Sequence, residues 1–167
     1  AVTNVADPHY AFLGPTTRET LNRIGVRSFQ GIALRAGDER LGVLYVNYGQ
    51  PQTFGEEDAR KLQTFAGHAA LALKNARLVA QLQRTREAAG VIAGITLQEK
   101  LGQTLKAIAQ HVQQVLGCDV VTIYAYDELT GQWGEWAAEI RQPRRPDSVR
   151  PPKELRPDSV VWSILNL

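Results

Sequence analysis

Two neighbouring segments in the N-terminal half have the apolar pattern of β-strands, residues 26–35 and 40–48. The second contains Leu-Gly-Val-Leu-Tyr-Val at residues 41–46, which is apolar on both faces. Such a run is typical of a central strand that is covered on both sides. Residues 36–39, Ala-Gly-Asp-Glu, separate the two segments, and Gly37 is free to adopt a positive φ. We therefore predict an antiparallel hairpin.

Two amphipathic segments follow, and both have helical periodicity. The first is predicted from about residue 55 to 89, with acidic residues in its first turn, where they favour the helix dipole. Its apolar positions recur at spacings of three and four residues, which defines one stripe of a helix. These positions are Leu62, Phe65, Ala66, Ala69, Leu73, Ala76 and Val79, and they are flanked by Leu71, Leu78 and Leu82. The second helix is predicted from about residue 95 to 116, where Gly117 ends it.

The C-terminal part begins with a strand, Val-Val-Thr-Ile-Tyr-Ala-Tyr at residues 120–126, and continues through a turn into a partner strand over residues 132–140. Residues 141–158 are rich in proline and arginine and show no periodicity, so they predict a loop. Basic and acidic residues are interleaved in this loop without aromatic residues, and this pattern does not favour nucleic-acid binding. The segment from Ser159 onward predicts the start of a helix.

The bulk properties are those of an ordinary globular chain. It has 167 residues, of which 44% are hydrophobic, and a net charge of +2, which is too small to attract nucleic acid or an anionic membrane. No apolar run approaches the roughly 20 residues of a membrane span, and no signal peptide is recognisable. The chain contains no methionine, and we expect it to be part of a longer protein.

Candidate metal and redox chemistry is sparse. The single cysteine, Cys118, excludes an internal disulfide and a cysteine-rich zinc site. We interpret it as a buried hydrophobic residue rather than as a chromophore attachment site or a redox nucleophile. His9, His68 and His111 lie far apart in the sequence and lack metal-ligand spacing. We predict no metal, no cofactor and no catalytic residues.

Three ordered segments resemble the C-terminal half of a GAF domain. They are residues 41–46, Phe-Gly-Glu-Glu-Asp at residues 54–58, and Phe-Ala-Gly-His-Ala-Ala-Leu-Ala-Leu-Lys-Asn-Ala-Arg-Leu at residues 65–78. Residues 101–127 resemble the N-terminal half of such a domain. The resemblance thus divides the chain into the C-terminal half of one GAF domain (1–89), a linker (90–96) and the N-terminal half of another (97–167), as in a tandem array.

The family implies an α+β fold, in which an antiparallel sheet carries helices on both faces and a small-molecule pocket on one of them. It also implies a function. We expect a non-enzymatic sensory or regulatory module of a larger cytoplasmic signal-transduction protein, such as a histidine kinase or a cyclic-nucleotide enzyme. An unidentified ligand or partner would act through the long helices on an output domain. The alternative is a structural dimerisation module with a vestigial pocket. Fold analogy does not identify the ligand.

Aromatic residues of the predicted strands, Tyr126 and Trp136 among them, could line the pocket, and we select Tyr45, Tyr124, Trp133 and Trp162 as the candidates. Such aromatic residues are equally typical of a sheet core. Some GAF domains carry an Asn-Lys…Phe-x-x-x-Asp-Glu signature for cyclic nucleotides. Here Asn47, Phe54 and Asp58 match it, but Tyr48 and Ala59 stand in the lysine and glutamate places. We therefore expect no high-affinity cyclic-nucleotide binding, and we interpret Phe54 and Asp58 as stabilising the start of the long helix.

The helical face is wider than one sheet can cover, so we predict a homodimer. The predicted interface residues are Phe65, Ala69, Leu73, Ala76, Leu78 and Leu82. We also predict that residues 41–48 and 120–126 pair antiparallel and form a composite domain, either within one chain or by exchange of halves between two chains. At ~1.5 Å per residue, the first predicted helix spans roughly 50 Å and the second roughly 33 Å. Folded back along the first helix, the second would end before it reached the strands, so this difference in length favours the exchange.

Overall fold

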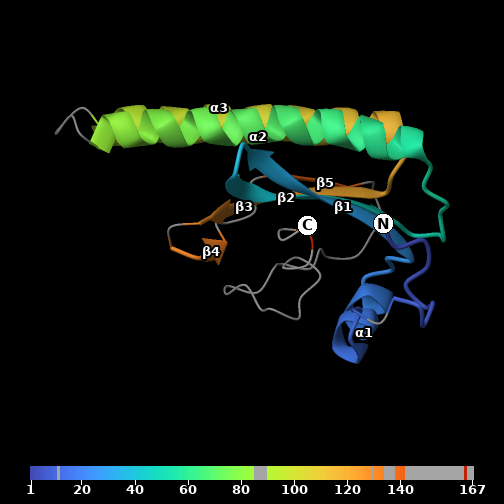
Figure 1. Ribbon diagram of the computed structural model, residues 1–167. Helices are drawn as coiled ribbons and strands as arrows, with labels where there is room; N and C mark the ends of the chain where they lie inside the picture. Colours follow the sequence, from blue (N-terminus) through green and yellow to red (C-terminus); the bar gives the residue numbers. More distant parts are fainter. Residues whose placement is uncertain (11, 85–89, 129, 134–137, 142–163, 165–167) are drawn as a thin grey trace.

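The computed structural model describes the chain except residues 11, 85–89, 129, 134–137, 142–163 and 165–167 (Figure 1). Three helices and five strands occur in the described part. In chain order they are α1 (Pro15–Arg23), β1 (Ser28–Ala36), β2 (Glu39–Tyr48), α2 (Glu56–Arg84), α3 (Gly90–Leu116), β3 (Val120–Asp127), β4 (Gln132–Trp133) and β5 (Ala138–Arg141). The expected α+β class is confirmed. The expected loop over residues 141–158 falls almost entirely outside the described residues.

The sheet is antiparallel throughout, with strand order β1-β2-β3-β4, and β5 also pairs with β3. The predicted hairpin joins β1 and β2, and Gly37 in its turn has a φ of +65°. β2 lies between β1 and β3, and its residues 41–46 are all buried, as expected of a central strand. The single strand expected over residues 132–140 is instead described as two short strands, β4 and β5, both paired with β3.

The predicted pairing between the two halves of the chain is confirmed. Leu44 of β2 lies opposite Ile123 of β3, and Val46 lies opposite Val121. Both strands belong to the same chain, so the preference for an exchange between two chains is wrong. A hydrogen bond of 3.0 Å from the Asp119 amide to the Asn47 carbonyl oxygen joins the residue before β3 to the end of β2, where the chain passes from α3 into the sheet.

The two helices do not differ in length as predicted, because their ends lie elsewhere. α2 has 29 residues and ends at Arg84, while α3 has 27 residues and begins at Gly90. The two helices are therefore nearly equal in length and run side by side, so α3 returns the chain to the sheet (Figure 1). Residues 90–96, which we expected to be a linker, are the first turns of α3.

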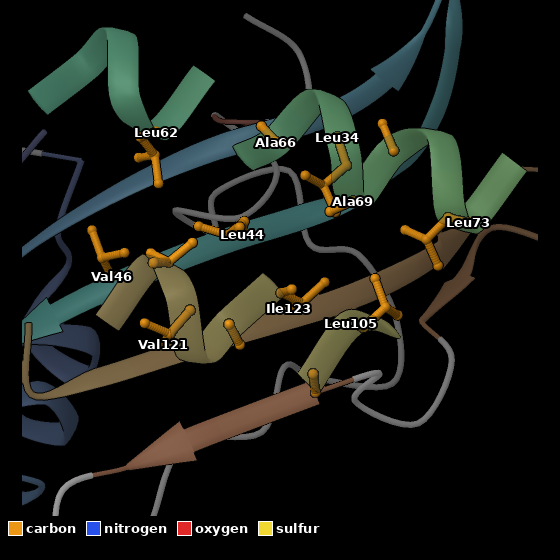
Figure 2. Packing of buried hydrophobic residues seen from close by; sticks show 14 of the residues in the cluster. Leu34, Leu44, Val46, Leu62, Ala66, Ala69, Leu73, Leu105, Val121 and Ile123 are labelled. Carbon is orange, nitrogen blue, oxygen red and sulfur yellow. The ribbon is translucent and has the colours of Figure 1, made fainter. Parts of the chain in front are cut away.

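The two long helices cover one face of the sheet, and the main core lies between these layers. Leu44 and Ile123 point from the sheet toward the helices, where Ala69, Leu73 and Leu105 meet them (Figure 2). All five residues are at most 3% exposed. This core draws on both halves of the chain, so neither half could retain it alone.

The N-terminal segment and α1 cover part of the opposite face. Val2 forms a bridge with Phe29 of β1, and Leu13 is buried in a second apolar cluster beneath the sheet. The Arg18 guanidinium holds this segment together, because it donates to the carbonyl oxygens of Val5, Leu13 and Tyr10. The sheet thus has helices on both faces, as the family resemblance implied.

Candidate functional site

Five aromatic side chains lie together on the sheet face that points away from α2 and α3. We call this set, Phe29, Tyr45, Tyr124, Tyr126 and Trp133, the aromatic face. The Tyr45 ring contacts the rings of Phe29 and Tyr124 edge-on, with centroids 6.2 Å apart in each pair. The rings of Tyr126 and Trp133 lie 4.9 Å apart. Side-chain alternation along four adjacent strands, β1 to β4, produces this arrangement.

The structure brings together three of the four candidate ligand residues. Tyr45 and Tyr124 are buried, and Trp133 is partly buried against the same cluster. Trp162 lies outside the described residues. Sequence reasoning did not select Phe29 or Tyr126, although the two-residue period of a strand places Tyr126 on the same face as Tyr124.

Two polar atoms of the aromatic face are buried without a hydrogen-bond partner among the described residues. They are the Tyr45 hydroxyl and the Trp133 Nε1. An unsatisfied buried polar group costs about 1–3 kcal/mol, so such groups in a folded protein call for an explanation. A bound molecule would supply one. Trp133 Nε1 can only donate, whereas a tyrosine hydroxyl can donate or accept.

The phenols of Tyr45 and Tyr124 are neutral at physiological pH, because the pKa of each is raised. Burial raises the pKa of Tyr45 well above its usual value, and repulsion between the ionised forms of Tyr45 and Tyr124 adds to the increase. Burial also raises the pKa of Tyr124, as does the nearby Glu139 carboxylate, while a hydrogen bond with Thr122 opposes the change. Both hydroxyls therefore retain their protons and can act as hydrogen-bond donors to a ligand.

A cleft of about 290 Å³ adjoins the aromatic face at the edge formed by β1. Gly31 and Arg35 of β1, Gln63 and Gly67 of α2, and Ile164 are among the residues that line it. A Cβ atom on Gly31 would lie 2.4 Å from Ile164 Cδ1, and 2.8 Å from Cε1 of the Tyr45 ring. The absence of a side chain at residue 31 is therefore what lets Ile164 and the Tyr45 ring meet.

One arginine of α2 connects the long helix to the strands of the aromatic face. The Arg77 guanidinium forms a 3.0 Å ion pair with Glu39 at the start of β2. It also donates to the backbone carbonyl oxygen of Tyr126 near the end of β3. Sequence reasoning missed this contact, because the three residues are far apart in the chain and only the sheet pairing brings them together.

The residues that partly match the cyclic-nucleotide signature have structural roles. Asp58 lies in the first turn of α2, and its carboxylate accepts a hydrogen bond of 3.0 Å from the Gly55 amide. Tyr48 points to the helix-covered face, where its ring lies 5.6 Å from that of Phe54 and its hydroxyl donates to the Leu116 carbonyl oxygen. This geometry supports our interpretation that Phe54 and Asp58 stabilise the start of the helix.

Cys118 is fully buried in the main core, as predicted. Burial raises the pKa of its thiol to about 12, so the nucleophilic thiolate is not populated at neutral pH. Among the residues that the structure describes, no three histidine, cysteine, aspartate or glutamate side chains are grouped as a metal site would require. Within the same part of the chain, no helix is long and apolar enough to cross a membrane.

The six residues expected at a dimer interface fall on two sides of α2. Ala69 and Leu73 are buried in the core of their own chain, and Phe65 is partly buried against that core. Leu78 and Leu82 are 49% and 67% exposed. Ala76 is partly buried in the groove between α2 and α3. The single predicted face is therefore two separate faces.

Comparisons with known proteins agree with the resemblance over part of the chain. No curated protein and no solved structure matches it. A family model does match, over a region that contains α1, β1, β2 and the first half of α2. This region contains Tyr45 and the main-core residues that come from β1, β2 and the first part of α2. Residues 1–73 match the model of the GAF domain, whose family consists of signalling and sensory modules that are regulatory rather than catalytic.

Proposed function

We propose that this chain is a sensory or regulatory module of a larger cytoplasmic signal-transduction protein. It combines the C-terminal half of one GAF domain with the N-terminal half of another, and the two halves share one sheet. A small molecule binds at the aromatic face, and its occupancy shifts the packing of α2 and α3, which lead to an output domain. A histidine kinase or a cyclic-nucleotide enzyme would be such a host protein.

The observation that carries this proposal is a pair of buried polar atoms, the Tyr45 hydroxyl and the Trp133 Nε1, for which the described part of the chain offers no hydrogen-bond partner. Both belong to one aromatic face, and both can donate a hydrogen bond. A flat ligand with hydrogen-bond acceptors on its edge would stack against the rings and satisfy both donors. Apolar lining with a few well-placed polar groups is typical of small-molecule sites.

The route from site to helices runs through the strands. β2 presents Tyr45 on the ligand side and Leu44 to the helices, and β3 does the same with Tyr124 and Ile123. A displacement of either strand must therefore be accommodated by the core beneath α2 and α3, because close-packed interiors transmit strain. Arg77 adds a polar link between α2 and both strands. A ligand can shift the balance between two packings of α2 and α3 only if it binds to one of them more tightly. The shared strands allow such a difference, because a change in the helix packing also moves the residues that contact the ligand.

The test is mass spectrometry of small molecules that copurify with the protein, carried out on the wild type and two variants. We expect Tyr45→Phe to lose or weaken the ligand, because its hydroxyl is removed. In ligand-free protein the same change should preserve or raise stability, since it deletes an unpartnered buried group. Tyr48→Phe is the matched control: it removes a buried hydroxyl on the opposite face, so it should leave the ligand bound.

One observation favours the alternative, a structural dimerisation module with a vestigial pocket. Ile164 is only 8% exposed and packs in the apolar cluster that contains the aromatic face. A side chain of the protein itself thus takes up space that a ligand could use. If the wild type retains no small molecule, the sensory proposal fails and this alternative holds.

A further inference from the structure

The last turns of α2 lie beyond the part of the helix that is packed on the sheet. Leu73 is buried in the main core, whereas Leu78 and Leu82 are exposed. At this end the paired helices extend past the sheet (Figure 1). Arg77 comes one turn after Leu73, so its contacts with the strands lie at the point where α2 leaves the sheet.

The ladder between β2 and β3 ends at the same place. Its last pair is Gly42 and Ala125, although both strands continue past it. Beyond that pair, the Arg77 guanidinium forms its 3.0 Å ion pair with Glu39 of β2 and donates to the carbonyl oxygen of Tyr126 in β3. We call these two contacts the Arg77 clasp, with a Glu39 arm and a Tyr126 arm. The clasp holds α2 to two strands at once.

The two arms differ, because only the Tyr126 arm involves a residue of the aromatic face. The Tyr126 ring is buried and lies 4.9 Å from the ring of Trp133, which is also its partner in the β3–β4 ladder. Two ladder pairs join β4 to β3. Glu39 lies at the start of β2, next to the hairpin turn, and is partly exposed. A movement of Trp133 therefore acts on Tyr126 directly and reaches α2 through the carbonyl oxygen of that residue.

We propose that the Arg77 clasp makes the attachment of the last turns of α2 depend on the ring pair of Tyr126 and Trp133. While the rings are in contact, both arms hold α2 to the sheet. When Trp133 turns to donate its indole N–H to a bound molecule, Tyr126 shifts and its carbonyl oxygen leaves the guanidinium. The Glu39 arm then holds α2 alone, and residues 78–84 open more often. This inference rests on the proposed function and deepens it, because it names the residue through which occupancy of the aromatic face reaches α2.

An arginine suits this task for two reasons. Its planar guanidinium presents several N–H donors in a fixed fork, so it can hold a carboxylate and a carbonyl oxygen at the same time. The side chains of Arg77 and Glu39 are both partly exposed, so solvent screens their ion pair and leaves it modest in strength. Such a clasp can open while the core stays folded, because local opening needs less free energy than global unfolding.

Hydrogen–deuterium exchange of the whole 167-residue chain tests the clasp without any ligand. Trp133→Leu removes the ring contact and keeps the strand backbone. We expect it to speed exchange of residues 78–84 by roughly three- to tenfold, a factor that one hydrogen bond to a charged group can supply. Residues 60–70, nearer the other end of α2, should keep their wild-type rates. Trp133→Phe retains a ring, so it should have a smaller effect of the same kind, and it replaces the leucine variant if that variant does not fold.

A double-mutant comparison identifies Arg77 as the route. Arg77→Gln should speed exchange of residues 78–84 by itself, and in this background Trp133→Leu should add nothing further. Glu39→Gln is the matched variant: it weakens the other arm and leaves the Tyr126 arm, so Trp133→Leu should still speed exchange there. Lys61→Gln is the control, because it removes a 2.8 Å ion pair with Glu57 within α2 and should change neither result. Circular dichroism confirms that each variant is folded.

Two outcomes would overturn the proposal. One is that the effects of Arg77→Gln and Trp133→Leu multiply in the double variant. The other is that Trp133→Leu speeds exchange equally at both ends of α2, which would indicate a general loss of stability. Since no ligand takes part, both outcomes differ from a failure of the proposed function, which would appear as the absence of a copurifying small molecule.

Discussion

Replacing Leu44 with alanine tests whether the two halves of the chain form one cooperative domain. Leu44 lies in β2, within residues 1–73, and is fully buried. Its strand neighbour is Ile123 of β3, from the other half. Both side chains point into the core beneath α2 and α3 (Figure 2). If the two halves form one domain, a destabilising change at residue 44 must also destabilise the C-terminal half.

The magnitude follows from burial. Leucine-to-alanine changes at fully buried sites cost about 2–5 kcal/mol, because the transfer free energy is lost and a cavity remains. Leu44 lies in a central strand between two packed layers, where the surroundings cannot easily collapse. We therefore expect a loss of about 3 kcal/mol, which lowers the melting midpoint of a chain of this size by about 10 °C.

The assay uses the distribution of tryptophan in the sequence. All three tryptophans, at positions 133, 136 and 162, lie in the C-terminal half, so their fluorescence reports on that half alone. Circular dichroism at helical wavelengths reports on both long helices. In Leu44→Ala the two signals should shift together and by the same amount. Leu71→Ala is the matched control, because Leu71 belongs to the same half but is 58% exposed, so it should have little effect.

A tryptophan transition that stays at the wild-type midpoint, while the helical signal moves, would refute the composite domain. That result would mean that the C-terminal half folds independently of β2. Two resolved transitions in the wild type would lead to the same conclusion.

Three further predictions address the strand joint, the buried thiol and the ligand class. Gly42→Ala should destabilise the chain by about 1–3 kcal/mol, because the new Cβ would lie 2.1 Å from a carbonyl oxygen of β3. Gly102→Ala is the control: residue 102 lies in a helix with open space around it, so the change should stabilise the chain by about 0.5–1 kcal/mol. Urea titration measures both effects. Cys118 should resist thiol reagents in the native protein at neutral pH. Its pKa is raised from 9.0 to about 12, so the unfolded chain loses this proton first, and stability should fall as the pH rises from 9 to 12, by up to roughly 1 kcal/mol per pH unit in denaturation curves. Calorimetry should show no micromolar binding of cAMP or cGMP, because Tyr48 and Ala59 stand where the signature has lysine and glutamate; tight binding of either nucleotide would contradict this.

The sequence pattern by itself predicted the central strand and the two long helices of this protein. The doubly apolar run of residues 41–46 predicted a central strand, and the spacing of apolar residues predicted both long helices. These patterns depend only on which side chains share a face, and that follows from the two-residue and 3.6-residue periods of the backbone. The pairing of β2 with β3 was also predicted, but through the family resemblance rather than from any local signal.

The tertiary structure alone decided how these elements close. We expected a linker over residues 90–96, yet these residues, Gly90 and Gly94 included, lie within α3, because tertiary packing overrides the weak helix propensity of glycine. That difference of a few residues equalises the two helices and lets one chain complete the sheet. Likewise, α2 is apolar on two sides, and its sequence cannot say which side meets its own sheet. The structure buries Ala69 and Leu73 and leaves Leu78 and Leu82 outside, since only three-dimensional packing determines which stripe is covered.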